Sequence, residues 1–185
     1  MTELAKRLLA AASSLSAAVQ RIKELKGREE SKPILIVISD RGQVGRFIHK
    51  PSPTFNLLSE NLWPGPLTLI GNAKGGVPDE ITAGTETVGI RPPSDDKVRA
   101  LIDVCSGALK PTSANPSHEA PAKTSEDVRA YFGDEIDLIV DEGAARTDQP
   151  STFVDARANE LKLIREGVIG WAEIQKELDK VASSN

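Results

Sequence analysis

Pro33-Ile34-Leu35-Ile36-Val37-Ile38 is the stretch of sequence that decides the fold. The run is aliphatic throughout and mostly β-branched, without the polar alternation of a strand that has one face in water, so it predicts a strand buried on both faces. The polar run Ser39-Asp40-Arg41-Gly42 ends it. A strand of this kind is typical of sheets that have helices packed against them.

Helical and strand patterns alternate outward from this stretch. Before it, apolar residues recur at steps of three and four from Thr2, which predicts an amphipathic helix that Gly27 ends. After it, we expect helices at 54–62, 95–105, 124–131 and 171–181, and strands at 67–70, 87–91, 108–109, 136–140, 152–155 and 161–164. Several connections are too short for helical crossovers, so the prediction is an α/β fold with a mixed sheet of roughly six or seven strands.

Composition limits the classes of function. The 185 residues, 39% of them hydrophobic, suit one sizeable domain, and the net charge of −4 gives no global positive field for nucleic acid or an anionic membrane. The single cysteine, Cys105, excludes an internal disulfide and is interpreted as a small buried hydrophobe. No apolar run is long enough to span a membrane, and we predict a cytoplasmic protein.

A rigid polar loop, Lys110-Pro111-Thr112-Ser113-Ala114-Asn115-Pro116-Ser117, follows the strand predicted at 108–109. Its two prolines fix the backbone, while Ser113 and Asn115 offer hydroxyl and amide groups close together. Such a loop lies at the carboxyl edge of a strand, where α/β proteins usually bind ligands. The alternative is that these residues only form a turn.

Cations stand at the ends of several predicted elements. Lys26 falls in the last turn of the first helix and Arg28 just beyond it, so both are expected at an exposed helix end. If the cations converge, they create a local positive potential suited to a triphosphate or a carboxylate. The alternative is that they lie at the ends of helices and strands without forming a common site. His49 and His118 are isolated, and no phosphate-binding glycine loop, metal-ligand cluster or catalytic triad is present.

Six motifs occur in order along the chain: Leu25-Lys26-Gly27-Arg28 followed by Ser31-Lys32-Pro33, Leu62-Trp63-Pro64-Gly65-Pro66-Leu67-Thr68-Leu69, Val77-Pro78-Asp79-Glu80-Ile81-Thr82-Ala83-Gly84, Thr87-Val88-Gly89-Ile90-Arg91, Thr112-Ser113-Ala114-Asn115, and Ser151-Thr152-Phe153-Val154-Asp155 with Ile164-Arg165-Glu166-Gly167-Val168-Ile169. Together they resemble the YrdC-type domain of threonylcarbamoyl-AMP synthases, from about residue 17 to residue 169. We therefore divide the chain into a YrdC-type domain at 1–169 and a C-terminal helix and tail at 170–185.

The resemblance implies a single-domain twisted mixed sheet with flanking helices and a concave, locally positive cleft. It implies ATP, L-threonine and bicarbonate as substrates, with Mg²⁺ accompanying ATP and no metal site made by the protein alone. The products would be threonylcarbamoyl-AMP and pyrophosphate, which feed the threonylcarbamoyl-adenosine modification of tRNA through a downstream transferase. Binding of tRNA or double-stranded RNA is a further implication.

The family's site residues are carried over onto matching positions only. Catalytic roles fall on Lys26 and Arg28, which would neutralise phosphate charge during displacement at the α-phosphorus. Nucleotide-binding roles fall on Arg28, Lys32, Thr87, Asn115 and Arg165. Threonine-binding roles fall on Arg91, Ser113 and Ser151, and a bidentate contact from Arg91 to the threonine carboxylate has a clear physical basis.

One family feature has no match in this sequence. Members normally begin with a strand leading into a Pro-Thr-Asp/Glu-Thr-Val-Tyr-Gly-Leu segment that lines the threonine pocket, and nothing similar precedes Leu9. The sequence therefore predicts a member shortened at its N-terminus. The alternative is a non-catalytic YrdC-type module that binds nucleotide or double-stranded RNA but does not activate threonine.

Overall fold

The computed structural model describes residues 21–22, 24–26, 35–105, 107–141, 143 and 149–182. Residues 21–22 and 24–26 are helical, in agreement with the end of the predicted first helix. The rest of that helix, together with Gly27, Arg28 and Lys32, lies outside the described residues.

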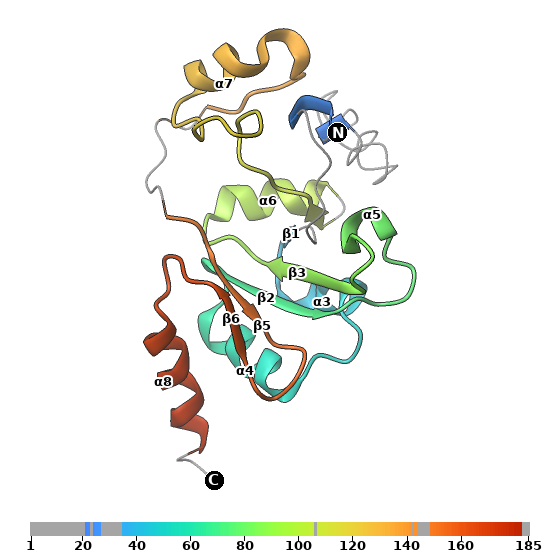
Figure 1. Cartoon of the computed structure of the whole chain (residues 1–185), viewed down its shortest axis with the longest axis vertical. Helices are drawn as coiled ribbons and strands as arrows, with labels where there is room; N and C mark the ends of the chain where they lie inside the picture. Colours follow the sequence, from blue (N-terminus) through green and yellow to red (C-terminus); the bar gives the residue numbers. More distant parts are fainter. Residues whose placement is uncertain are drawn as a thin grey trace.

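A mixed sheet of six strands organises the described part of the chain (Figure 1). Its strands are β1 (Leu35–Ile38), β2 (Leu67–Asn72), β3 (Thr87–Arg91), β4 (Ala108–Leu109), β5 (Thr152–Asp155) and β6 (Lys162–Arg165), in the order β4-β1-β3-β2-β5-β6. The pairs β1/β3 and β2/β5 are parallel, and the other neighbours are antiparallel. The predicted α/β class and the mixed sheet are confirmed.

The four helices predicted after the first strand are present, and two further short helices, at 44–47 and 79–82, were not predicted. They are α3 (Val44–Phe47), α4 (Pro53–Leu62), α5 (Asp79–Thr82), α6 (Asp96–Val104), α7 (Ser125–Phe132) and α8 (Trp171–Ala182), with short 3₁₀ turns η1 (Arg41–Gln43) and η2 (Gly133–Glu135). The Ser52 and Asp95 side chains accept hydrogen bonds from first-turn amides of α4 and α6, so both helices begin at a favourable N-cap. In the described residues, no helix has the length and apolar character needed to cross a membrane.

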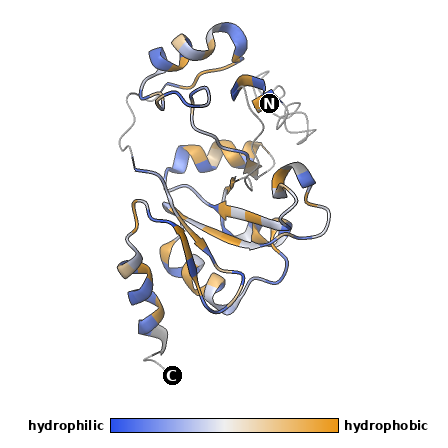
Figure 2. Cartoon of the chain, in the orientation of Figure 1, coloured by the Kyte–Doolittle hydropathy of each residue, from blue (hydrophilic) through white to orange (hydrophobic). Residues whose placement is uncertain are grey.

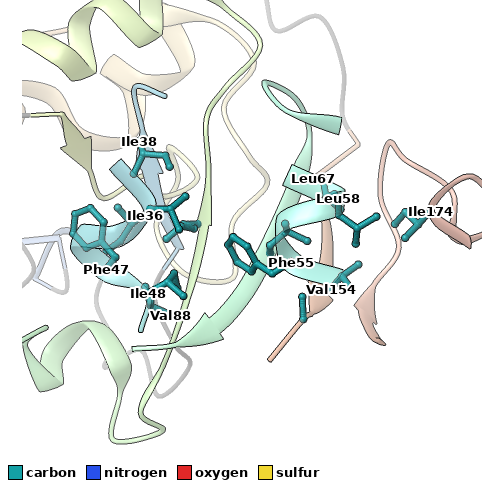
Figure 3. Close-up of a cluster of buried hydrophobic side chains, with 14 of the residues drawn as sticks. Ile36, Ile38, Phe47, Ile48, Phe55, Leu58, Leu67, Val88, Val154 and Ile174 are labelled. Atoms are coloured by element: carbon teal, nitrogen blue, oxygen red, sulfur yellow. The ribbon is translucent and has the colours of Figure 1, made fainter. Parts of the chain in front are cut away.

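The main core is formed by the sheet together with α4 and α8, and the short helices α3 and α5 contribute to it. Its fully buried members include Phe55 and Leu58 of α4, Leu67 and Val154 of the sheet, and Ile174 of α8. Figure 3 shows Leu58 and Ile174 on facing sides of the α4–α8 contact. The hydropathy colouring of α8 alternates between hydrophobic and hydrophilic residues, as expected for a helix with one buried face (Figure 2).

A second, smaller buried group lies on the other side of the sheet. Ile102 and Cys105 at the end of α6 are buried but do not belong to the main core, and α6 contacts β1 and β4. Figure 1 shows α6 and α4 on opposite sides of the sheet. The interpretation of Cys105 as a small buried hydrophobe is confirmed, and burial raises the pKa of its thiol. The α6 helix therefore packs on the β4–β1 end of this second face, away from β2, β5 and β6.

The strand predicted at 136–140 is wrong. These residues follow η2 as irregular chain, and Leu138 and Val140 expose 43% and 65% of their surface. A strand is stabilised by pairing, and these residues pair with no strand of the described sheet. The apolar run was misleading because apolar composition alone does not supply a partner strand.

The α7 helix begins with a capping box. Thr124 accepts a hydrogen bond from the Asp127 amide, and the Asp127 carboxylate accepts hydrogen bonds from the Thr124 and Lys123 amides at 3.1 and 2.9 Å. These backbone donors hold the pKa of the Asp127 carboxyl below its usual range. The box therefore depends on the ionised form of Asp127.

We expect Asp127→Asn to lower the melting temperature at pH 7 and to have little effect at acid pH. Because the folded-state pKa is lowered, the stabilisation is complete above the unfolded pKa of about 3.9 and is lost as the pH falls through the folded value. Thermal melting followed by circular dichroism between pH 7 and pH 3 measures the difference. The exposed Asp137→Asn variant is the control, and a difference between Asp127→Asn and the wild type that persists undiminished at pH 3 would contradict the prediction.

Candidate functional site

Lys26 is buried against the polar loop that leaves β4. Its ammonium donates to the Ser113 carbonyl at 2.9 Å, the Ser113 hydroxyl at 3.0 Å and the Asn115 carbonyl at 2.9 Å. The Lys26 carbonyl also accepts a hydrogen bond from the Ser117 amide at 3.1 Å. The sequence therefore predicted correctly that these three motif positions belong together, although they are nearly ninety residues apart.

The expectation that Lys26 lies at an exposed helix end is wrong, because only 6% of its surface is accessible. The three N–H donors of an ammonium group match three oxygens arranged around it, and this arrangement removes the side chain from water. Lys26 thus holds the shape of the loop, in addition to any charge it presents to a ligand.

Two buried polar atoms of the same loop have no hydrogen-bond partner among the residues that the structure describes. They are the Asn115 amide oxygen and the Ser117 hydroxyl. The Asn115 amide nitrogen is engaged by the Pro116 and Glu119 carbonyls at 3.0 and 2.7 Å, which fixes the orientation of the side chain. A buried acceptor without a partner costs free energy, so a ligand that donates to it is bound favourably.

A row of side chains crosses the sheet on the face opposite the main core. Thr68 of β2 lies opposite Phe153 of β5, which in turn lies opposite Arg165 of β6. Ile70 of β2 pairs with Gly89 of β3. Side chains two residues apart in a strand point to the same face of the sheet, so Thr68 and Arg91 share this face. The row therefore runs Arg91, Thr68, Phe153, Arg165.

The polar loop leaves the sheet from β4, the edge strand two positions away from the Arg91 end of this row. Val37 pairs with Arg91 on one side and with Leu109 on the other, and Leu109 is the last residue of β4. The residues after Leu109 form the loop that Lys26 holds. The loop and the row are thus connected through the backbone pairing of β4, β1 and β3.

Arg91 ends β3 with a half-buried side chain. Within the described part of the chain, its Nε atom is buried without a hydrogen-bond partner, and its Nη1 atom makes a long contact of 3.5 Å to the Gly65 carbonyl. Burial lowers the pKa of the guanidinium. A desolvated cation with a donor left unpaired among the described residues is suited to bind an anion, and a carboxylate fits the planar fork of donors.

Ser151 and Arg165 lie at the other end of the row. The buried Thr68 hydroxyl donates to the Ser151 hydroxyl at 3.1 Å, and Arg165 donates to the Ser151 carbonyl at 2.9 Å. The Arg165 guanidinium lies 4.5 Å from the centre of the Phe153 ring, and its partial burial lowers its pKa. Arg91 and Arg165 stand three strands apart, about 14 Å between backbones.

Thr87 lies farther away on the same face. It precedes Arg91 by four residues on β3, a separation of about 13 Å along the strand. Its hydroxyl is buried and forms a hydrogen bond with the Thr85 hydroxyl at 2.8 Å. The structure thus groups Lys26 with Ser113 and Asn115, and Arg91 with Ser151 and Arg165, whereas Thr87 stands apart from both groups.

Sequence reasoning did not single out Thr68 or Phe153. Both are inside quoted motifs, but an isolated threonine or phenylalanine in a strand is interpreted as core, and only the register shows that they face the site. The signal available in the sequence was period-two spacing, since Phe153 is two residues from Ser151 and Asp155.

The fold and this site define a class of α/β protein in which cations and hydroxyl groups line one face of a mixed sheet, and a rigid polar loop follows the edge strand β4. Residues 8–167 match the family model described as "Telomere recombination", which is named for Sua5, YciO and YrdC. The chain belongs to this family.

Curated relatives carry a more specific name. The chain is 32% identical over 148 residues to a threonylcarbamoyl-AMP synthase of Idiomarina loihiensis, with 78% of each chain covered. It is 36% identical over 141 residues to that of Marinobacter nauticus, with 75% of this chain and 73% of the relative covered. These names do not favour the alternative of a non-catalytic module.

A solved structure of a related protein has the same fold. The chain matches the crystal structure of Pyrococcus abyssi Sua5 complexed with L-threonine with a TM-score of 0.83 and 31% identity. The match covers 91% of this chain and 49% of that one, so the chain spans about half the length of the Pyrococcus protein.

Proposed function

We propose that this chain is a threonylcarbamoyl-AMP synthase, which converts L-threonine, bicarbonate and ATP into threonylcarbamoyl-AMP and pyrophosphate. The observation that carries the proposal is the row bounded by Arg91 and Arg165, together with the polar loop that Lys26 holds. The relatives that bear this name support it. The product would pass to a transferase that modifies tRNA.

The two cations suit the two anionic groups of the product. Arg91 would bind the threonine carboxylate with its unpaired donors, and Ser151, held by Thr68, would contact the same substrate. Arg165 would bind phosphate at the other end of the row. The short carbamate that joins these groups in threonylcarbamoyl-AMP would then lie between Arg91 and Arg165.

The loop would bind the nucleotide beside the row. Asn115 presents a buried oxygen that a nucleotide N–H or O–H donor would satisfy, and the Ser113 hydroxyl remains able to donate toward the threonine side. For Arg28, Lys32 and Thr87 we propose the nucleotide-binding roles that the family resemblance implies.

The proposed reaction has two steps. The threonine amine forms a C–N bond with the carbon of bicarbonate and water leaves, giving a carbamate. A carbamate oxygen then attacks the α-phosphorus of ATP, and the bond from that phosphorus to the pyrophosphate oxygen breaks. Negative charge increases on the phosphate oxygens during this step, and nearby cations stabilise it without reorganisation, which is the role proposed for Lys26, Arg28 and Arg165.

We propose that Mg²⁺ enters with ATP. Among the residues that the structure describes, no three His, Cys, Asp or Glu side chains are grouped closely enough to hold a metal ion. Mg²⁺ commonly keeps several waters and binds through substrate phosphates, so a protein cage is not required. The ion would neutralise phosphate charge, and the protein's own residues would bind and orient the substrates.

A direct assay tests the proposal. The purified chain incubated with ATP, threonine, bicarbonate and Mg²⁺ is expected to release pyrophosphate and to form threonylcarbamoyl-AMP, identified by mass spectrometry. Omitting threonine or bicarbonate should stop both signals, and EDTA should suppress them until excess Mg²⁺ is added. ATP binding without any pyrophosphate release would rule out synthase activity and favour the non-catalytic alternative.

Thr68→Val is expected to raise KM for threonine roughly fivefold, because valine has the same shape but cannot donate to the Ser151 hydroxyl. KM for ATP should change little, since the loop that binds the nucleotide is intact. Steady-state pyrophosphate release measures both constants. Thr68→Ser keeps the hydroxyl and is the matched control; equal effects of the valine and serine variants would show that the hydrogen bond is unimportant.

A further inference from the structure

Phe153 and Arg165 form a stacked pair on the site face. The ring and the guanidinium are direct cross-strand partners, and their separation of 4.5 Å is within the range of a cation–π contact. The only hydrogen bond from the Arg165 guanidinium to another described residue is the one to the Ser151 carbonyl. Most of its five N–H donors are thus available to a ligand on that face.

Gly89 makes room for the ring. A Cβ atom at this position would lie 3.6 Å from Phe153 Cε1 and 3.2 Å from the Thr68 methyl group. The Phe153 ring therefore reaches from β5 across β2 toward the bare backbone of β3. A side chain at position 89 would press on Thr68 and on the edge of the ring that supports Arg165.

A β-bulge in β6 turns Arg165 toward this ring. Val154 pairs with Leu163, but Phe153 pairs with Arg165, so Ile164 is an extra residue in the strand. Leu163 packs against the main core. In a regular strand Arg165, two residues later, would point to the same core face. The bulge reverses this direction and places the cation on the site face, as bulges beside functional sites often do.

We propose that Phe153 is a positioning residue for the nucleotide: its ring, seated over Gly89, holds the bulge-directed Arg165 guanidinium in place to bind phosphate. The proposal rests on the proposed function for the identity of the ligand. Phe153 acts through Arg165, so its effect should appear in nucleotide affinity and should require the arginine.

The test is calorimetric titration of the full chain with ATP, together with steady-state kinetics. Phe153→Leu is expected to weaken ATP binding and to raise KM for ATP roughly fivefold, while kcat and KM for threonine change less than about twofold. Phe153→Tyr keeps the ring and should retain wild-type affinity. Gly89→Ala should act in the same direction as Phe153→Leu, and Phe132→Leu, a buried position in α7, should leave ATP affinity unchanged.

A double variant separates positioning from general destabilisation. In the Arg165→Gln background, Phe153→Leu should have no additional effect on ATP affinity, because the group that it positions is gone. Equal effects in both backgrounds would overturn the proposal, as would a Phe153→Leu variant that melts earlier but binds ATP like the wild type. Wild-type ATP binding without turnover would refute the synthase activity and leave the test of Phe153 valid, because the titration needs no reaction.

Discussion

Lys26→Met is expected to reduce threonylcarbamoyl-AMP formation at least about 100-fold and to lower the free energy of unfolding by roughly 2–3 kcal/mol. Methionine fills a similar volume but removes the ammonium, so the Ser113 and Asn115 oxygens lose their buried donor. The loop would then no longer hold the Asn115 amide oxygen in its buried position. Pyrophosphate release measures the first effect and urea denaturation the second.

The exposed Lys176→Met variant on α8 is the matched control, since it makes the same chemical change away from the site. It should retain wild-type turnover and stability. A Lys26→Met protein that loses turnover but keeps its full stability would show that Lys26 acts on the substrate only and does not hold the loop. Wild-type turnover in Lys26→Met would remove Lys26 from the site altogether.

Arg91→Lys is expected to lower kcat/KM for threonine roughly 100-fold, with a much smaller change in KM for ATP. Lysine keeps the positive charge, but it cannot form the bidentate contact that the planar guanidinium makes with a carboxylate. The loss of two hydrogen bonds to a charged group accounts for an effect of this size. Kinetics at varied threonine and fixed ATP, and then the reverse, separate the two substrates.

Arg129→Lys on the exposed face of α7 is the control for this substitution and should behave as the wild type. If Arg91→Lys weakens ATP and threonine equally, Arg91 does not distinguish the carboxylate from the triphosphate. An unchanged KM for threonine would mean that the unpaired donors of Arg91 serve another group.

Much of the fold could be predicted from the sequence because its elements have strong local signals. The continuous β-branched run at 35–38, the capping box at Thr124 and the proline-bounded helix α4 are determined by interactions between near neighbours in the chain. The apolar run at 136–140 carries the same kind of local signal, but it forms no strand, since pairing depends on a distant partner.

The site was predictable to the extent that motif order identifies a family. Lys26, Ser113 and Asn115 were expected together, and they are in contact. Their burial was not expected, because helical periodicity places Lys26 at a helix end without showing what covers that end. Thr68 and Phe153 were missed, because nothing local distinguishes a site-facing residue in a strand from a core residue.

The sequence by itself determined the α/β class, most of the elements and the family, since each follows from local periodicity, capping or an ordered set of motifs. Only the tertiary structure decided which face each strand residue occupies. That choice depends on strand register and on the bulge at Ile164, which turns Arg165 away from the core and toward Phe153. Register arises from pairing between distant segments, and a shift of one residue reverses every side chain, so no local pattern can supply it.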